Sequence, residues 1–205
     1  MITCDVYEDA TICTPSALNM QGRIGGQRSG VNNWDLTFKA LTAAKARIQT
    51  MNQTKAFSKP CLDDLAKLKL PDDSLSGERS VRSSDVATKL NSVNIYDGNT
   101  SWRPIAEIVN GVPFYGTVGL LFSPNNEQGL SIQALTLGNT QYYAEDLYAM
   151  DPNLLAGTLM HETLHSLGFS DTDLENKLIG TGSGVSDTTN IAKLLGTDCF
   201  GYRGN

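Results

Sequence analysis

The sequence predicts a single α+β domain over residues 1–205, with a mixed β-sheet packed on helices and a small C-terminal lobe. Apolar residues recur at three- and four-residue steps over residues 34–56, which is typical of an amphipathic helix. Aromatic and aliphatic runs broken by turn residues follow between residues 93 and 137, as in β-strands. A second long helix is predicted at 152–167, and we expect it to be the central element of the domain.

The first half of the chain is expected to be mainly helical. Asn33 can cap the helix at 34–56, and a shorter helix at 62–70 should stop at Pro71, because proline cannot continue a helix. The other segments expected before residue 93 are a strand or hairpin at 1–13, a surface loop at 16–33, a loop at 71–84 and a short helix at 84–91 capped by Ser83 or Ser84.

The β-region is expected to hold strands at 93–96, 114–122 and 130–137. The turn signal Asp97-Gly98 follows the first of them. After the second long helix, residues 180–186 predict a glycine-rich loop, and residues 187–195 predict a last helix.

The helix at 152–167 carries both histidines of the chain. Asp151 is suited to the N-cap and Pro152 to the first helical position. His161 and His165 are four residues apart, so both imidazoles lie on one face of the helix and can bind one metal ion. Glu162 is rotated by about 100° around the helix, beside the ion, where a general base must stand.

The residues after this helix extend the motif. Gly168 can adopt the left-handed conformation that ends helices, which turns the chain back toward the metal. Asp171 can then supply a carboxylate as the third ligand and leave the fourth position open for water, as in catalytic zinc sites. Asp173 is the competing ligand, and the alternative for Asp171 is a surface turn or a helix N-cap.

His161, Glu162, His165, Gly168 and Asp171 together resemble the extended motif of the metzincin clan of metallopeptidases, His-Glu-x-x-His-x-x-Gly-x-x-His/Asp. The final aspartate is similar to that of the snapalysin-type small secreted endopeptidases. No methionine follows Met160, so the methionine turn of the clan is not found. The resemblance implies a zincin-like fold and a zinc-dependent endopeptidase, with Zn²⁺ held by the two histidines and the aspartate and with Glu162 as the catalytic general base.

Two further features are candidates for substrate contacts. Residues 131–137 can form an exposed sheet edge that pairs with an extended peptide, although an internal strand is the alternative. Tyr202 is the only tyrosine after the motif and is a candidate donor to the oxyanion. Two other functions stay open: an effector- or toxin-type protease domain of a larger polypeptide that cleaves one protein, and a binding module with a vestigial metal site.

The charge of the chain restricts its partners. The net charge is −6, which disfavours nucleic acid and anionic membranes, because phosphate binding needs a basic surface. No run of residues approaches the ~20 apolar positions that a membrane span needs. The expected partner is therefore a protein or peptide substrate.

Four widely spaced cysteines predict two disulfides and a secreted or extracytoplasmic location. Pairing Cys4 with Cys13 and Cys61 with Cys199 is one of three possible connectivities, and four reduced thiols in a cytosolic protein are the alternative. The first residues show no signal peptide. The chain is therefore expected to be a mature form with an added methionine, a piece of a larger protein or a cytosolic protein.

Overall fold

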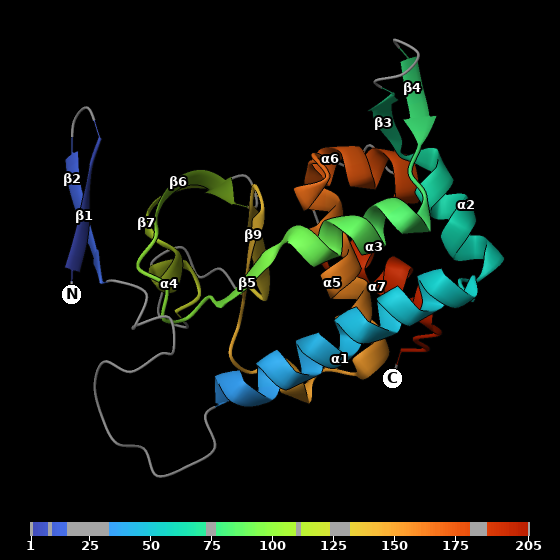
Figure 1. The fold of residues 1–205 in the computed structure, drawn as a ribbon, viewed down its shortest axis with the longest axis horizontal. Helices are drawn as coiled ribbons and strands as arrows, with labels where there is room; N and C mark the ends of the chain where they lie inside the picture. The colour runs from blue at the N-terminus through green and yellow to red at the C-terminus, as the bar shows by residue number, and fades with distance from the viewer. Residues whose placement is uncertain are drawn as a thin grey trace.

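The structure is a computed structural model that describes residues 2–7, 10–15, 33–72, 77–109, 112–123, 132–180 and 188–204. Helices and small sheets are mixed in these residues, which confirms the α+β class (Figure 1). The helices are α1 (Asn33–Thr54), α2 (Lys59–Lys67), α3 (Ser83–Ser92), α4 (Val118–Leu121), α5 (Pro152–Ser166), α6 (Asp171–Leu174) and α7 (Thr188–Phe200), with a 3-10 turn η2 (Leu147–Ala149) and a π-helical turn η3 (Glu175–Ile179).

The strands form one three-stranded sheet and three hairpins in the described part of the chain. In the sheet, β5 (Asn94–Asp97) runs parallel to β9 (Thr140–Tyr143), and β8 (Ala134–Leu137) runs antiparallel to β9. The sheet is therefore mixed, as predicted, with the order β5-β9-β8. The antiparallel hairpins pair β1 (Ile2–Tyr7) with β2 (Ala10–Pro15), β3 (Lys69–Asp72) with β4 (Gly77–Ser80), and β6 (Pro104–Val109) with β7 (Val112–Thr117).

Helix α5 lies at the centre of the helical part, with α1, α3 and α7 packed around it (Figure 1). All ten residues from Leu155 to Leu164 are buried, because neighbours cover the helix on every side. Its start matches the prediction: the Asp151 carboxylate accepts the N–H groups of Asn153 and Leu154, and Pro152 occupies the first turn.

Two glycines let α5 and α7 approach each other closely. A Cβ atom placed on Gly157 would lie 2.5 Å from the backbone nitrogen of Gly196 and would also collide with the carbonyl oxygen of Ala192. The two backbones are therefore in direct contact at this crossing, and no side chain larger than hydrogen fits at residue 157.

The predicted end of the second helix is wrong. Helix α2 begins at Lys59, after Ser58, whose hydroxyl accepts the N–H of Cys61 at 3.2 Å, and it ends at Lys67. Leu68 is already extended, so the helix ends four residues before Pro71, which lies in β3. The loop expected at 71–84 instead contains β4 and the start of α3.

The observed boundaries of β7, α3 and α7 also differ from the predicted ones. The strand expected at 114–122 ends at Thr117, whose hydroxyl caps the short helix α4 by accepting the N–H of Leu120. Ser83 is the first residue of α3 and not its cap. The N-cap is Arg82, whose N–H donates to the Asp85 carboxylate. Helix α7 extends to Phe200, beyond the predicted end at residue 195. Residues 16–32 and 181–187, which cover most of the two predicted loops, lie outside the described residues.

A disulfide joins Cys61 on α2 to Cys199 at the end of α7, a pair that belongs to one of the three connectivities left open by the sequence. The register of the first hairpin places Cys4 opposite Cys13 on β1 and β2. A second disulfide between these two residues stays a prediction.

None of the helices in the described ranges has the length and apolar character that crossing a bilayer requires.

Candidate metal centre

His161 and His165 lie on adjacent turns of α5 with their ring centroids 4.5 Å apart. The His161 side chain is only 5% exposed, and that of His165 is 17% exposed. The helical spacing therefore brings both rings to one side of the helix, as predicted, with His161 deeper in the protein.

The turn after α5 is a Schellman motif centred on Gly168. The N–H of Phe169 donates to Leu164 O at 3.2 Å, and the N–H of Gly168 donates to His165 O at 2.9 Å. Gly168 has a φ of +104°, a conformation that residues with a side chain rarely adopt. The predicted glycine turn is confirmed, and it reverses the chain so that α6 begins beside the histidines.

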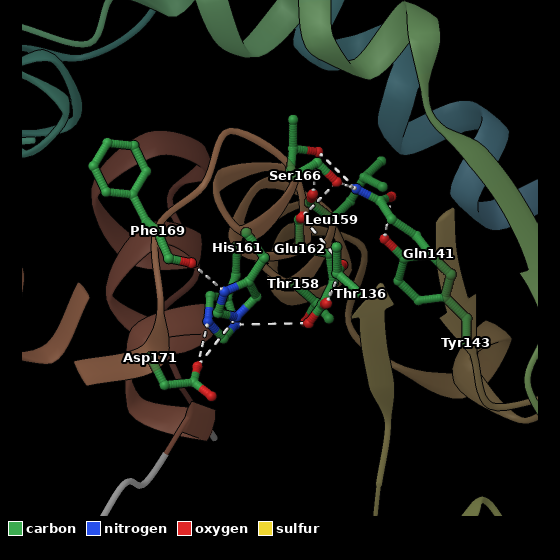
Figure 2. A network of polar contacts seen from close by, with 12 residues as sticks. Thr136, Gln141, Tyr143, Thr158, Leu159, His161, Glu162, Ser166, Phe169 and Asp171 are labelled. Atoms are coloured by element: carbon green, nitrogen blue, oxygen red, sulfur yellow. Dashed lines mark hydrogen bonds and ion pairs between the residues drawn. The ribbon is translucent and has the colours of Figure 1, made fainter. Parts of the chain in front are cut away.

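Asp171 is brought back to the two histidines by this turn. Its Oδ1 atom lies 3.3 Å from His161 Nε2 and 3.1 Å from His165 Nε2, and Figure 2 shows the carboxylate directed at the imidazoles. One ligand atom from each of the three residues lies within 4.8 Å of the others. The group of ligands predicted from the sequence is therefore assembled in the fold and could hold a metal ion.

Two of the separations between the donor atoms are compatible with a tetrahedral zinc site. Ligands bound at 2.0–2.1 Å in a tetrahedron are separated by about 3.3–3.4 Å, close to the distances from Asp171 Oδ1 to the two Nε2 atoms. His161 Nε2 and Asp171 Oδ1 are both buried and have no hydrogen-bond partner among the described residues. Such atoms are costly when they are left alone, and a shared metal ion would satisfy both.

The ring of His165 is oriented from behind by the backbone. Its Nδ1 lies 2.7 Å from the carbonyl oxygen of Phe169 and donates its proton there, so Nε2 faces Asp171 and can offer its lone pair to a metal ion bound between the two residues. This contact is typical of histidines that bind metals, in which the second ring nitrogen is held by an acceptor.

Asp173 is excluded as the competing ligand in this fold. Its Oδ2 atom accepts both the N–H and the hydroxyl of Ser170, at 3.0 and 2.6 Å, and completes a capping box at the start of α6. Ser170 is also the N-cap of α6, so Asp171 is the first residue of that helix and not the N-cap that was its alternative role.

Glu162 lies next to the histidines and is 5% exposed. Its Oε2 atom accepts a hydrogen bond from Thr136 Oγ1 at 2.6 Å, while Oε1 lies 3.9 Å from His161 Nδ1 (Figure 2). Glu162 therefore lies beside His161 and is not one of the three candidate ligands.

A second polar network attaches the sheet to α5 behind Glu162. Gln141 Nε2 donates to Thr163 Oγ1 at 3.4 Å and to Ser166 Oγ at 3.3 Å, and Ser166 Oγ donates to the backbone oxygen of Glu162. Tyr143 donates its hydroxyl to Gln141 Oε1 at 2.9 Å. Burial and the charge of Glu162 raise the pKa of Tyr143, so its hydroxyl keeps its proton and remains a donor.

The charges at the centre stabilise one another. Burial disfavours a charged His165, but the carboxylates of Asp171 and Glu162 outweigh it and raise the pKa of His165 to about 9. Burial acts against ionisation of Asp171 as well, yet the two imidazoles outweigh it and lower the pKa of that carboxyl. Without a metal, the centre is held together as an ion pair.

The structure contradicts the proposed role of Tyr202. Its N–H donates to Gly196 O, its Cβ lies beside Gly196, and it lines a surface depression together with Asp151 and Asn153. Asn153 is eight residues before His161, which places it about 12 Å away along α5. Tyr202 therefore lies at the wrong end of the helix to contact a substrate at the histidines.

Two contributors to the centre had no signal in the sequence. Thr136 contacts Glu162 across 26 residues of chain, and it was included only as part of the strand predicted at 130–137. Phe169 contributes through its backbone oxygen, which every residue type offers. The sequence could have indicated Phe169 only by its place in the turn after Gly168.

Comparison of the chain with models of known families, with curated proteins and with solved structures finds no match. The function of the centre must therefore be inferred from the chemistry of its own residues.

Proposed function

We propose that this protein is a zinc-dependent endopeptidase of zincin type. The observation that carries the proposal is the convergence of His161 Nε2, His165 Nε2 and Asp171 Oδ1, with the Glu162 carboxylate beside the His161 ring. Two imidazoles and one carboxylate leave one position of a tetrahedral ion free, which is the composition of a catalytic zinc site. A purely structural site has no need of the adjacent carboxylate.

The residues divide the chemistry between them. Zn²⁺ bound by His161, His165 and Asp171 would supply a Lewis acid that lowers the pKa of water and polarises the scissile carbonyl. Glu162 accepts the proton of the attacking water at its carboxylate and returns it to the leaving amine. Phe169 keeps the His165 ring in the tautomer that presents Nε2.

Strand β8 offers the place where an extended peptide can bind. It is an edge strand in the described part of the sheet, with β9 as its only partner there. The N–H of Ala144 donates to Gln133 O, so in this antiparallel ladder Leu135 and Leu137 also bond toward β9. The backbone groups of Ala134 and Thr136 consequently face the open edge, where a substrate strand can pair with them.

The remaining parts of the proposal concern location and partners. The disulfide between Cys61 and Cys199 is typical of proteins in oxidising compartments, which supports a secreted or extracytoplasmic location. The net charge of −6 supports a protein or peptide substrate over a nucleic acid.

The test combines metal analysis with a peptidase assay. The purified protein should contain one zinc per chain and hydrolyse unfolded casein, and a chelator should abolish hydrolysis until zinc is restored. Zinc binding without hydrolysis of casein or of a peptide library would contradict the proposal that the protein is an endopeptidase of broad specificity. Cleavage of one native protein alone would favour the effector-type protease, and retention of zinc without any cleavage would favour the binding module.

A further inference from the structure

We propose that Thr136 is a positioning residue for Glu162, through which the edge strand β8 holds the general base in its working orientation. The inference rests on the proposed function of Glu162 and identifies a residue outside the metal-binding motif that this function needs.

The first argument is that the two carboxylate oxygens of Glu162 have different contacts. The hydrogen bond from Thr136 Oγ1 to Glu162 Oε2 is 2.6 Å long, within the range of a hydroxyl that donates to an ionised carboxylate. The same hydroxyl lies 3.2 Å from the backbone oxygen of Glu162, but it has one proton, and the shorter distance indicates that this proton is donated to the carboxylate. Oε1 is left on the side of His161, at 3.9 Å from Nδ1. The bond therefore fixes one oxygen and leaves the other for proton transfer.

The second argument is the direction of the Thr136 side chain. Thr136 pairs with Gln141 across the β8–β9 ladder, so both side chains lie on the same face of the sheet. Gln141 binds Thr163 and Ser166, which identifies this face as the one that contacts α5. Threonine is also branched at Cβ and has few accessible rotamers, which makes it a stiffer support than serine.

The third argument is that Thr136 takes part in both the substrate edge and the base. Its backbone N–H and C=O point to the open edge of β8, while its side chain binds Glu162. A peptide paired with β8 would therefore run along the residue that orients the base. The distance between strand β8 and the Glu162 carboxylate is therefore fixed by Thr136. Catalysis needs such a fixed geometry, because the base must stay within reach of the reacting groups of a bound peptide.

The kinetic test replaces Thr136 with valine and with serine. Thr136→Val keeps the shape of the side chain but removes the hydroxyl, so kcat should fall by about 10- to 100-fold while KM and zinc content stay unchanged. Thr136→Ser keeps the hydroxyl and should recover most of kcat. Thr140→Val is the matched control, because Thr140 lies on β9 and points to the opposite face of the sheet.

A second readout does not depend on activity. In the chelated protein, Thr136→Val leaves the buried Glu162 carboxylate without its donor and should lower Tm. The same substitution in a Glu162→Ala background removes no such contact and should lower Tm less. Equal decreases in the two backgrounds would overturn the proposed contact.

The outcomes separate this inference from the proposed function. A parent protein that hydrolyses no peptide would overturn the endopeptidase assignment and the role of Thr136 with it. An active parent whose kcat is unchanged by Thr136→Val would overturn the role of Thr136 alone. Loss of zinc from Thr136→Val would also overturn it, because a positioning residue for the base leaves the ligands intact.

Discussion

The Oδ1 atom of Asp171 lies 3.1 Å from Nε2 of His165, although the two residues belong to different helices. Helix α5 ends at Ser166 and α6 begins at Asp171, so a turn of only four residues joins the two helices. The position of the third ligand therefore depends on this turn, whereas the spacing of the two histidines is set by α5.

Loss of the base and loss of the third ligand should have different effects. Glu162→Gln should keep one zinc per chain and lower kcat by about 10²–10⁴-fold, because only proton transfer fails. Asp171→Ala should lose zinc at a lower chelator concentration than the parent, since two imidazoles remain as ligands. Zinc retention against a graded chelator, measured beside peptide hydrolysis, checks both variants. Parent-like retention in Asp171→Ala would show that another residue completes the centre.

Removal of one histidine should abolish stoichiometric zinc binding. The sequence contains only His161 and His165, so no other imidazole can replace a lost one. Elemental analysis of His165→Ala is expected to find well below one zinc per chain. An unchanged zinc content in that variant would place the metal elsewhere in the protein.

Gly168→Val should reproduce part of the Asp171→Ala defect. Its φ of +104° is unfavourable for any residue with a side chain and most so for a β-branched one. The turn would have to relax, which moves Asp171 away from the histidines. A Cβ at this position meets no atom within 4 Å, so a weaker zinc affinity in the variant would arise from the backbone and not from a collision. Titration with a chelator, with circular dichroism as a control for folding, measures the effect.

Stability of the chelated protein should depend on pH through His165 and Asp171. The folded pKa of His165 is about 9, above its ordinary value of 6.5, so its contribution is complete below about pH 6.5 and is lost as the pH rises toward 9. The pKa of Asp171 is lowered, so its contribution is present above its ordinary value of 3.8 and is lost as the pH falls below it. Thermal unfolding between pH 3 and 9.5 should therefore show a larger change at both limits for the parent than for Asp171→Ala.

The disulfide should contribute strongly to folding. It closes a loop with a sequence separation of 138 residues, for which the chain-entropy account gives about 4–5 kcal/mol of unfolding free energy. The double variant Cys61→Ala/Cys199→Ala should lose most of this in denaturant unfolding, and thiol titration of the unreduced parent should detect no thiol from this pair. A loss below about 1 kcal/mol would contradict the prediction.

The local signals around α5 predicted the centre well, because the ligands are close in sequence. Asp151 and Pro152 fixed the start of the helix, the four-residue spacing aligned the histidines, and Gly168 determined the turn. Each of these is a backbone requirement that one or two residue types satisfy, so it can be recognised without knowing the rest of the fold.

The errors arose where tertiary contacts decided the structure. Pro71 was predicted to end a helix, but α2 already ends at Lys67, and the proline lies in the short strand β3. Tyr202 was chosen for its residue type alone, and the packing of Gly196 against α5 places it at the far end of that helix. Thr136 could not be found from the sequence, since nothing local indicates which side of a strand faces Glu162.

The covalent link between Cys61 and Cys199 also has a consequence for the lifetime of the protein. His161, Glu162, His165 and Asp171 all lie between the two cysteines in the chain. An endopeptidase of the proposed kind would be exposed to cleavage by its own copies, and one cut in a loop between residues 61 and 199 would leave both fragments in the same molecule. Such a nicked protein would migrate as one species on a non-reducing gel and as two species after reduction.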